Sequence, residues 1–100
     1  MHTNYEREKD WRKRGIIGCT VALYNELFEA QNGVCGICLK PPTNRALSVD
    51  HSHAITDRFN VRGLLHQTCN YKLGMVEKGI YKPNERELCY LAKFGLEVMV

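Results

Sequence analysis

Apolar residues recur at helical spacing between residues 20 and 31. The positions that share one helical face are Leu23, Tyr24, Leu27 and Phe28. Thr20 is a suitable N-cap because its hydroxyl can accept a backbone hydrogen bond, and the pair at 32–33, Asn-Gly, provides a stop. The pattern predicts a helix from Thr20 to about Gln31 whose apolar face packs in the core.

A second helix is predicted near the carboxyl end. The run from Asn84 to Glu87 approximates a capping box. The apolar residues that then face one way are Leu88, Leu91 and Ala92. We expect this helix to pack against the core. Residues 96–100 are mostly apolar and predict docking, with a second copy of the chain as one alternative, which would form a homodimer.

The middle of the chain predicts a hairpin followed by a helix. Residues 46–53 alternate loosely between apolar and polar types, which indicates a short strand, and residues 54–60 form a turn. Residues 61–65 are the expected return strand, and residues 66–73 a short helix closed by Gly74. This order, with flanking helices, predicts a small α+β fold.

The first 14 residues are polar and suit an exposed helix. Their opposite charges at i,i+4 spacing are Glu8/Arg12 and Asp10/Arg14. Positive charge gathers at Arg12, Lys13 and Arg14, so one interpretation is a basic helix that binds DNA phosphates. The alternative is a solvated or frayed arm, and both stay open.

Length and composition indicate one small domain. One hundred residues of 44% apolar composition bury only a moderate core, so an additional staple is expected. Five cysteines cannot all pair within the chain, which favours metal binding in a reducing compartment. No apolar run approaches the roughly 20 residues of a membrane span, and the charged amino end lacks the apolar core of a signal peptide. We expect a soluble intracellular, cytoplasmic protein.

Cysteine and histidine residues at matched spacing predict a structural zinc site. Two residues separate Cys35 from Cys38, and two separate His66 from Cys69. Zinc prefers four thiolate or imidazole ligands, and such a gap lets one backbone turn place two of them on the same ion. The alternative is a pair of buried or redox-active thiols beside a surface histidine. The remaining cysteines, expected to be small buried residues, are Cys19 and Cys89.

A second group of polar residues suits a hydrolytic metal site. It consists of Asp50, His51, His53 and Asn70. Carboxylate and carboxamide oxygens are ligands for Mg²⁺, and an imidazole beside the ion can take a proton from water. Strand alternation places Asp50 and His51 on opposite faces, so a single site requires a bend there. The alternative is a polar hairpin with surface histidines.

Three runs of residues carry a family resemblance. They are residues 31–38 (QNGVCGIC), 49–53 (VDHSH) and 61–70 (VRGLLHQTCN), followed by Leu73-Gly74. Together they closely resemble the recombination endonuclease VII family of the HNH, or ββα-metal (His-Me finger), nucleases, over about residues 20–75. The resemblance implies a zinc-stapled ββα-metal core flanked by helices. It also implies a metal-dependent endonuclease acting on DNA in a phage or its bacterial host.

The resemblance assigns roles to individual residues. Asp50 and Asn70 would hold a catalytic Mg²⁺ or Mn²⁺, and His51 would be the general base that activates water. His53 would contact the scissile phosphate or assist the leaving group. Arg62 would bind a neighbouring phosphate, with a solvent-exposed or salt-bridged arginine as the alternative.

The chain departs from the family pattern at two places. His66 stands where the family usually has cysteine, and imidazole is an acceptable zinc ligand. Residues 57–60 make the linker between the two strands longer, so the rim of the active site would differ. We expect a basic arm or helix at 1–18, the nuclease core at 19–75, and a helical packing segment at 76–100, with dimerisation through that segment as one option.

Three functions are compatible with these features. The first is a metal-dependent nuclease that nicks or cuts duplex or branched DNA, with junction resolution as one option. The second is a non-catalytic zinc module that binds nucleic acid, and the third is a structural zinc domain in a protein assembly. The predicted catalytic residues Asp50, His51 and Asn70 have no task under the last two.

Overall fold

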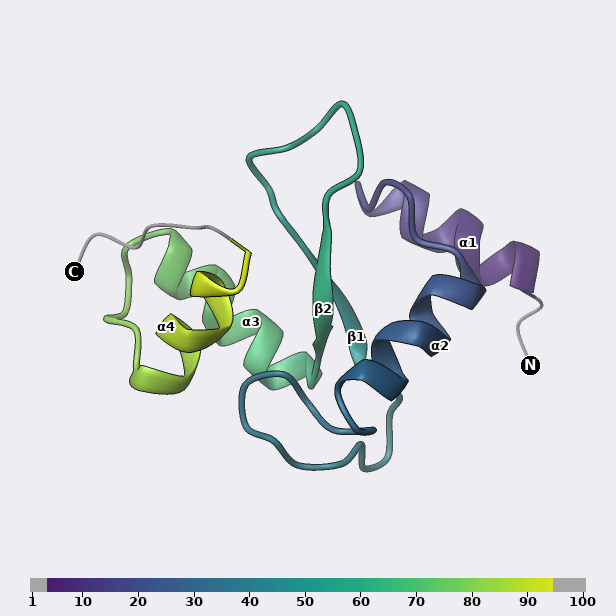
Figure 1. Cartoon of the computed structure of the whole chain (residues 1–100). Coiled ribbons are helices and arrows are strands. Elements are labelled where there is room, and N and C mark those ends of the chain that lie inside the picture. Colours follow the sequence, from purple (N-terminus) through teal and green to yellow (C-terminus); the bar gives the residue numbers. More distant parts are fainter. Residues whose placement is uncertain (1–3, 95–100) are drawn as a thin grey trace.

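The computed structural model describes residues 4–94, which form four helices around a two-stranded hairpin. In chain order the elements are α1 (Asn4–Lys13), α2 (Val21–Ala30), β1 (Ser48–His51), β2 (Val61–Leu65), α3 (Gln67–Glu77) and α4 (Glu85–Ala92) (Figure 1). The predicted α+β fold is confirmed. The apolar end at residues 96–100 lies outside the described residues. None of the helices described here is long and apolar enough to cross a membrane.

The caps predicted for α2 and α4 are both present. Thr20 Oγ1 accepts a hydrogen bond from the Leu23 N–H at 3.1 Å, and the chain leaves α2 with Gly33 at a φ of 72°. Asn84 and Glu87 form a full capping box, in which each side chain accepts from the other residue's N–H at 2.8 and 2.9 Å. Glu87 is 1% exposed, so this cap belongs to the interior and fixes where α4 begins.

The two strands form an irregular antiparallel hairpin. Val49 pairs with Leu64, and His51 pairs with Val61, so a bulge lies between these two pairs. β2 has the predicted bounds, whereas β1 is shorter than the predicted strand at 46–53. A bulge, which bends a strand, therefore lies at the position where a single site for Asp50 and His51 would require a bend.

α3 continues beyond its predicted end. Gly74 lies inside the helix, which ends at Glu77 and is followed by Gly79 at a φ of 80°. Leu73 and Val76 on the inner face are both buried. Because tertiary packing of Val76 stabilises the last turn, the low helix propensity of Gly74 does not end the helix.

α1 is an ordered helix packed against α2. The rings of Trp11 and Tyr24 stack with centroids 5.7 Å apart, and the Arg7 guanidinium lies over both rings. Glu8 accepts a hydrogen bond from the backbone N–H of Val21 at 2.9 Å, which adds a polar contact at the start of α2. The segment is therefore an ordered helix and not a frayed arm, and its binding to DNA phosphates stays a prediction.

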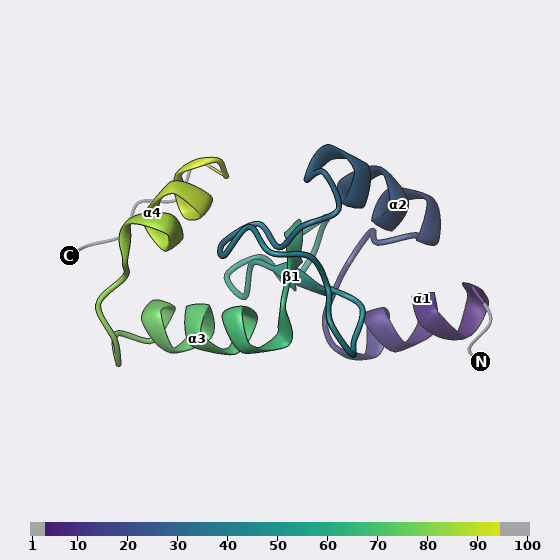
Figure 2. The ribbon, with the colours of Figure 1, turned by 90° about the horizontal axis from the view of Figure 1, so that it is seen from below.

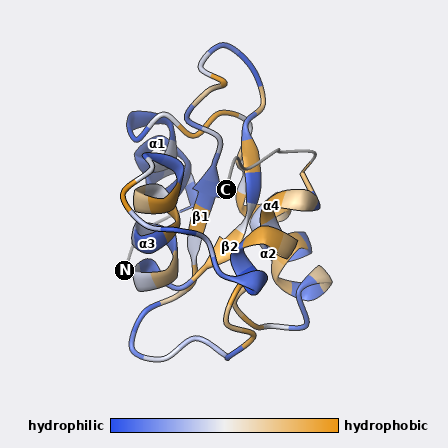
Figure 3. Cartoon of the chain, turned by 90° about the vertical axis from the view of Figure 1, so that its left-hand side faces the viewer, coloured by the Kyte–Doolittle hydropathy of each residue, from blue (hydrophilic) through white to orange (hydrophobic). Residues whose placement is uncertain are grey.

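The helices form two layers on either side of the hairpin. Figure 2 shows α1 and α3 along one side, and α2 and α4 along the other. Hydropathy colouring places many apolar residues on β2 and on the adjacent α2 and α4 (Figure 3). The leucines with the least exposure are Leu64, Leu65, Leu73 and Leu91.

The two cysteines outside the zinc pattern differ in burial. Cys19 is buried as expected, but Cys89 is exposed, so the expectation for Cys89 was wrong. α4 turns Glu87, Tyr90 and Leu91 inward, which leaves Cys89 on the outer face of the helix.

Candidate zinc site and candidate active site

The four predicted zinc ligands converge at one point. The ligand atoms of Cys35, Cys38, His66 and Cys69 all lie within 4.8 Å of one another. Tetrahedral zinc with bonds of about 2.3 Å to sulfur separates its ligands by about 3.8 Å. A small contraction is enough to close the cluster around an ion, so it could bind a structural metal such as zinc.

Hydrogen bonds around the cluster orient its ligands. His66 Nδ1 lies 3.0 Å from Cys38 Sγ, while Nε2 lies 2.9 Å from the carbonyl oxygen of Pro41. With the ring proton on Nε2, donated to Pro41, Nδ1 is left as a ligand, which is the usual arrangement of a metal-bound histidine. The backbone N–H groups of Ile37 and His66 each donate to Cys35 Sγ at 3.4 Å.

The thiols of the cluster differ in pKa. Burial alone raises the pKa of Cys35, but the backbone donors from His66, Cys38 and Ile37 outweigh it and lower the pKa below its ordinary value. For Cys69, burial and then the charges of Cys35 and Cys38 raise the pKa. Because neighbouring thiolates repel one another, a bound cation is what allows all three to ionise together.

A groove between α1 and α3 contains three of the predicted catalytic residues. Its volume is about 1390 Å³, and His51, His53 and Asn70 are among its lining residues. The ring centroids of the two histidines lie 4.4 Å apart. Within residues 4–94, no hydrogen bond engages the side chains of these three residues. Two imidazoles and a carboxamide are thus presented to a ligand in the groove.

The surroundings of His51 favour its neutral form. Burial lowers the pKa of His51, the neighbouring His53 lowers it further, and the charge of Asp50 acts in the opposite direction. Only a neutral imidazole can accept a proton, so this environment suits a general base near neutral pH.

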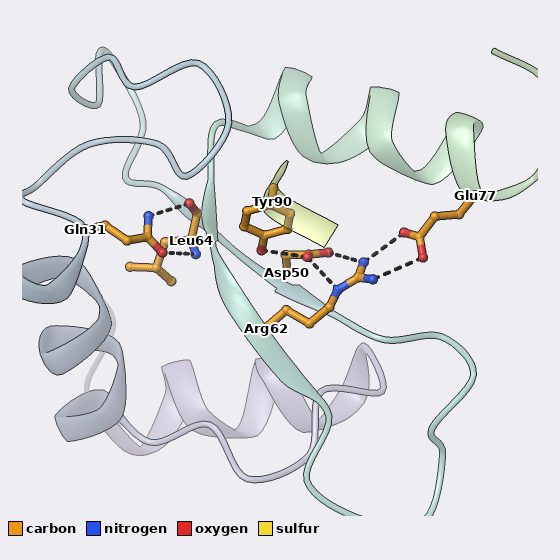
Figure 4. Close-up of polar contacts among 6 residues, drawn as sticks. All are labelled: Gln31, Asp50, Arg62, Leu64, Glu77 and Tyr90. Atoms are coloured by element: carbon orange, nitrogen blue, oxygen red, sulfur yellow. Dashed lines mark hydrogen bonds and ion pairs between the residues drawn. The ribbon is translucent and has the colours of Figure 1, made fainter. Parts of the chain in front are cut away.

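Asp50 does not line this groove and is bound within the core. Its Oδ2 accepts hydrogen bonds from Arg62 Nε at 2.7 Å and from the Tyr90 hydroxyl at 2.8 Å, and its Oδ1 accepts one from Arg62 Nη2 at 2.9 Å (Figure 4). Arg62 also donates to both carboxylate oxygens of Glu77, at 2.8 and 3.1 Å. Of the alternatives for Arg62, the structure shows the salt-bridged one, because this residue is 5% exposed and all three of its guanidinium nitrogens are engaged.

The surroundings of Asp50 limit its capacity to bind a cation. Its Oδ2 accepts two hydrogen bonds and its Oδ1 accepts one, and the residue is 2% exposed. Asn70 lines the groove and Asp50 does not, so of the two expected ligands for Mg²⁺ only the carboxamide is presented there. Asp50 would have to turn away from Arg62 and Tyr90 to share an ion with Asn70.

The comparison with known families covers nearly the whole chain. The model of the recombination endonuclease VII family matches residues 8–93 of the 100. The chain belongs to this family. It is accordingly a nuclease that acts on DNA. Searches of curated proteins and of solved structures gave no match.

The match includes α4 and most of α1, beyond the residues 20–75 whose motifs carry the resemblance. Of the basic residues predicted to bind DNA, Lys13 and Arg14 line the groove, whereas Arg12 is exposed elsewhere. Arg14 lies 3.0 Å from Asp10 in an exposed pair, which is weak enough for a phosphate to replace it. In this endonuclease VII family chain, α1 therefore forms one wall of the groove.

Several residues near the site were missed by sequence reasoning. Glu77 lines the groove and lies seven residues after Asn70, two helical turns along the same face, which is a signal that the sequence did contain. Tyr90 and Gln31 gave no such signal. The Gln31 side chain donates to Leu64 O and accepts from Leu64 N–H, both at 2.8 Å, as a neighbouring strand would (Figure 4).

Proposed function

We propose that this chain is a divalent-metal-dependent endodeoxyribonuclease that hydrolyses phosphodiester bonds in the groove between α1 and α3. The observation that supports the proposal is the gathering of His51, His53 and Asn70 in one groove beside the basic carboxyl end of α1. Asn70 directly follows the cluster residue Cys69, so the zinc site also holds the catalytic helix.

The residues divide the chemistry among them. His51 takes a proton from the attacking water, and His53 contacts the scissile phosphate or assists the leaving oxygen. Asp50 and Asn70 would hold Mg²⁺ or Mn²⁺, which when bound supplies positive charge to the developing transition state. Lys13 and Arg14 attract the DNA backbone without reading its sequence. We expect this activity inside a phage-infected or bacterial cell.

A non-catalytic zinc module that binds nucleic acid is the second candidate. The observation that favours it is the engagement of Asp50 by Arg62 and Tyr90, which is also how a purely structural carboxylate would be held. Under this alternative the zinc cluster still stabilises the fold and α1 still binds nucleic acid, but His51 and His53 have no function.

A nicking assay separates the two candidates. Zinc-loaded protein is incubated with supercoiled plasmid in the presence of Mg²⁺ or Mn²⁺, or of EDTA added briefly as the metal-free control. We expect metal-dependent nicking by the wild type and its loss in His51→Ala, with zinc content and DNA affinity unchanged. If the wild type cleaves no form of DNA with either metal, the binding module is the correct reading.

The same preparation can be tested on a four-way junction, a flap, a duplex and a single strand. Preference for the junction would identify a resolving enzyme, and equal cleavage a general nuclease. Sedimentation of the protein alone and with a junction tests whether it acts as a homodimer.

A further inference from the structure

We propose that Tyr71 and Gly74 form a base-binding subsite on α3, where an unpaired nucleobase stacks on the Tyr71 ring. The subsite adjoins Asn70, one of the residues expected to act in catalysis. The inference rests on the proposed function and specifies its substrate as single-stranded DNA, or a single-stranded segment of a larger DNA, in preference to a continuous duplex.

Tyr71 presents an aromatic ring in the groove that nothing else in residues 4–94 uses. It is 69% exposed, and of the exposed large hydrophobic residues in this part of the chain it alone lines the groove. No hydrogen bond and no second ring engages it within the same residues. Trp11, which also lines the groove, is instead stacked on Tyr24. The ring of Tyr71 is therefore available for a flat ligand.

Gly74 leaves the helix surface bare one turn beyond Tyr71, on the same face of α3. A Cβ built there would meet no atom within 4 Å among the described residues beyond the adjacent helix backbone, and the backbone has no positive φ that requires glycine. Glycine is unfavourable inside a helix, so its place here has no explanation in the packing of these residues. Glycine is typical of positions where a ligand approaches the backbone closely, and the bare surface leaves room for a base beside the ring.

Basic residues lie on both sides of the subsite. Lys78 lines the groove two helical turns after Tyr71, and Lys13 and Arg14 line it from α1, which runs along the same side of the molecule as α3 (Figure 2). Basic residues also outnumber acidic ones along the groove as a whole. Proteins bind single strands by combining a cationic groove for the phosphates with aromatic rings on which bases stack. In a continuous duplex each base face is covered by its neighbours, so Tyr71 would have no base to stack on.

The test measures DNA affinity by fluorescence anisotropy on zinc-loaded protein without added Mg²⁺ or Mn²⁺, so that binding is measured apart from cleavage. The probes are a labelled single strand, the same strand in a duplex, and a deoxyribose-phosphate oligomer of the same length without bases. The variants are Tyr71→Ala, Tyr71→Phe and Gly74→Leu, the last of which fills the bare surface. Tyr81→Ala is the matched control, because Tyr81 is 56% exposed but does not line the groove.

We expect Tyr71→Ala to weaken binding of the single strand about tenfold, an effect typical of losing one base–aromatic stack. Its affinity for the duplex and for the base-free oligomer should stay at the wild-type value. Tyr71→Phe keeps the ring and should bind all three probes like wild type, as should Tyr81→Ala. Gly74→Leu should raise the melting temperature, because leucine favours a helix more than glycine does, and yet weaken binding of the single strand.

Equal weakening of all three probes by Tyr71→Ala, or no weakening of any, would overturn the subsite. Because no cleavage is measured, that result would leave the proposed nuclease activity intact if the wild type nicks plasmid. A selective loss of single-strand binding in Tyr71→Ala, with a wild type that cleaves no DNA, would instead uphold the subsite and refute the proposed nuclease.

Discussion

The zinc cluster and the catalytic groove contain similar donors but reach their geometry differently. In the cluster, each pair of ligands is set by a short local turn, and backbone N–H groups complete it. In the groove, His51 and Asn70 come from different elements, and their approach depends on how α3 packs on the hairpin. Local spacing therefore predicts the first site well, whereas the second depends on tertiary contacts.

Asp50 shows where local spacing no longer predicts the position of a side chain. Its neighbour His51 faces the groove, while Asp50 itself is held by side chains from β2 and α4. Removing the zinc ion or one side chain at a time tests which contacts each site requires.

The largest effect is expected from loss of zinc. Structural zinc contributes about 10–16 kcal/mol in small zinc domains, which is comparable to or larger than the ~5–15 kcal/mol stability of a whole domain. A strong chelator, or Cys35→Ser, should abolish the cooperative thermal transition and empty both sites together. Cys89→Ser is the matched control, because Cys89 is exposed and outside the cluster. A metal-free protein that keeps its melting temperature would contradict the assignment.

The next effect concerns the buried ion pair. Arg62→Ala leaves the Asp50 carboxylate, which is 2% exposed, without its charged partner, and such a loss typically costs about 3–5 kcal/mol. We expect this decrease in the free energy of unfolding by urea titration, with one zinc still bound per chain. Arg14→Ala, which removes an exposed pair with Asp10, should change it by about 0–1 kcal/mol. Equal effects in the two variants would show that Asp50 gains no more from its partner than a surface residue.

Much of the fold follows from local signals in the sequence. Thr20 and the Asn84–Glu87 box fix the starts of α2 and α4, and the return strand has its predicted bounds. Gly74 was predicted to end α3, but the helix continues to Glu77 because Val76 packs in the core beyond it. The partners of Asp50 were not predictable, since the contact with Tyr90 joins residues 40 positions apart and leaves no periodic pattern.

Thiol reactivity gives a smaller but selective test. Burial and the charge of Glu8 raise the pKa of Cys19 to about 11, so this thiol is neutral at pH 8 and ionises only as the pH approaches that value. Exposed Cys89 should react with a disulfide reagent roughly two orders of magnitude faster than Cys19. We expect one fast thiol in zinc-loaded protein and all five after chelation, because the loss of zinc unfolds the chain and exposes Cys19 as well. Fast reaction of the three cluster thiols before chelation would indicate that the cluster holds no metal.

The smallest effect tests α1 as a wall of the groove. If Lys13 and Arg14 each neutralise one phosphate, removing either should weaken DNA binding and lower the salt slope of log affinity by about one. Fluorescence anisotropy with a duplex at several salt concentrations measures that slope. Lys93→Ala removes an exposed charge on the opposite layer and should leave it unchanged. If all three variants change the slope equally, the effect depends on net charge and not on position. α1 would then not be a DNA-binding wall of the groove.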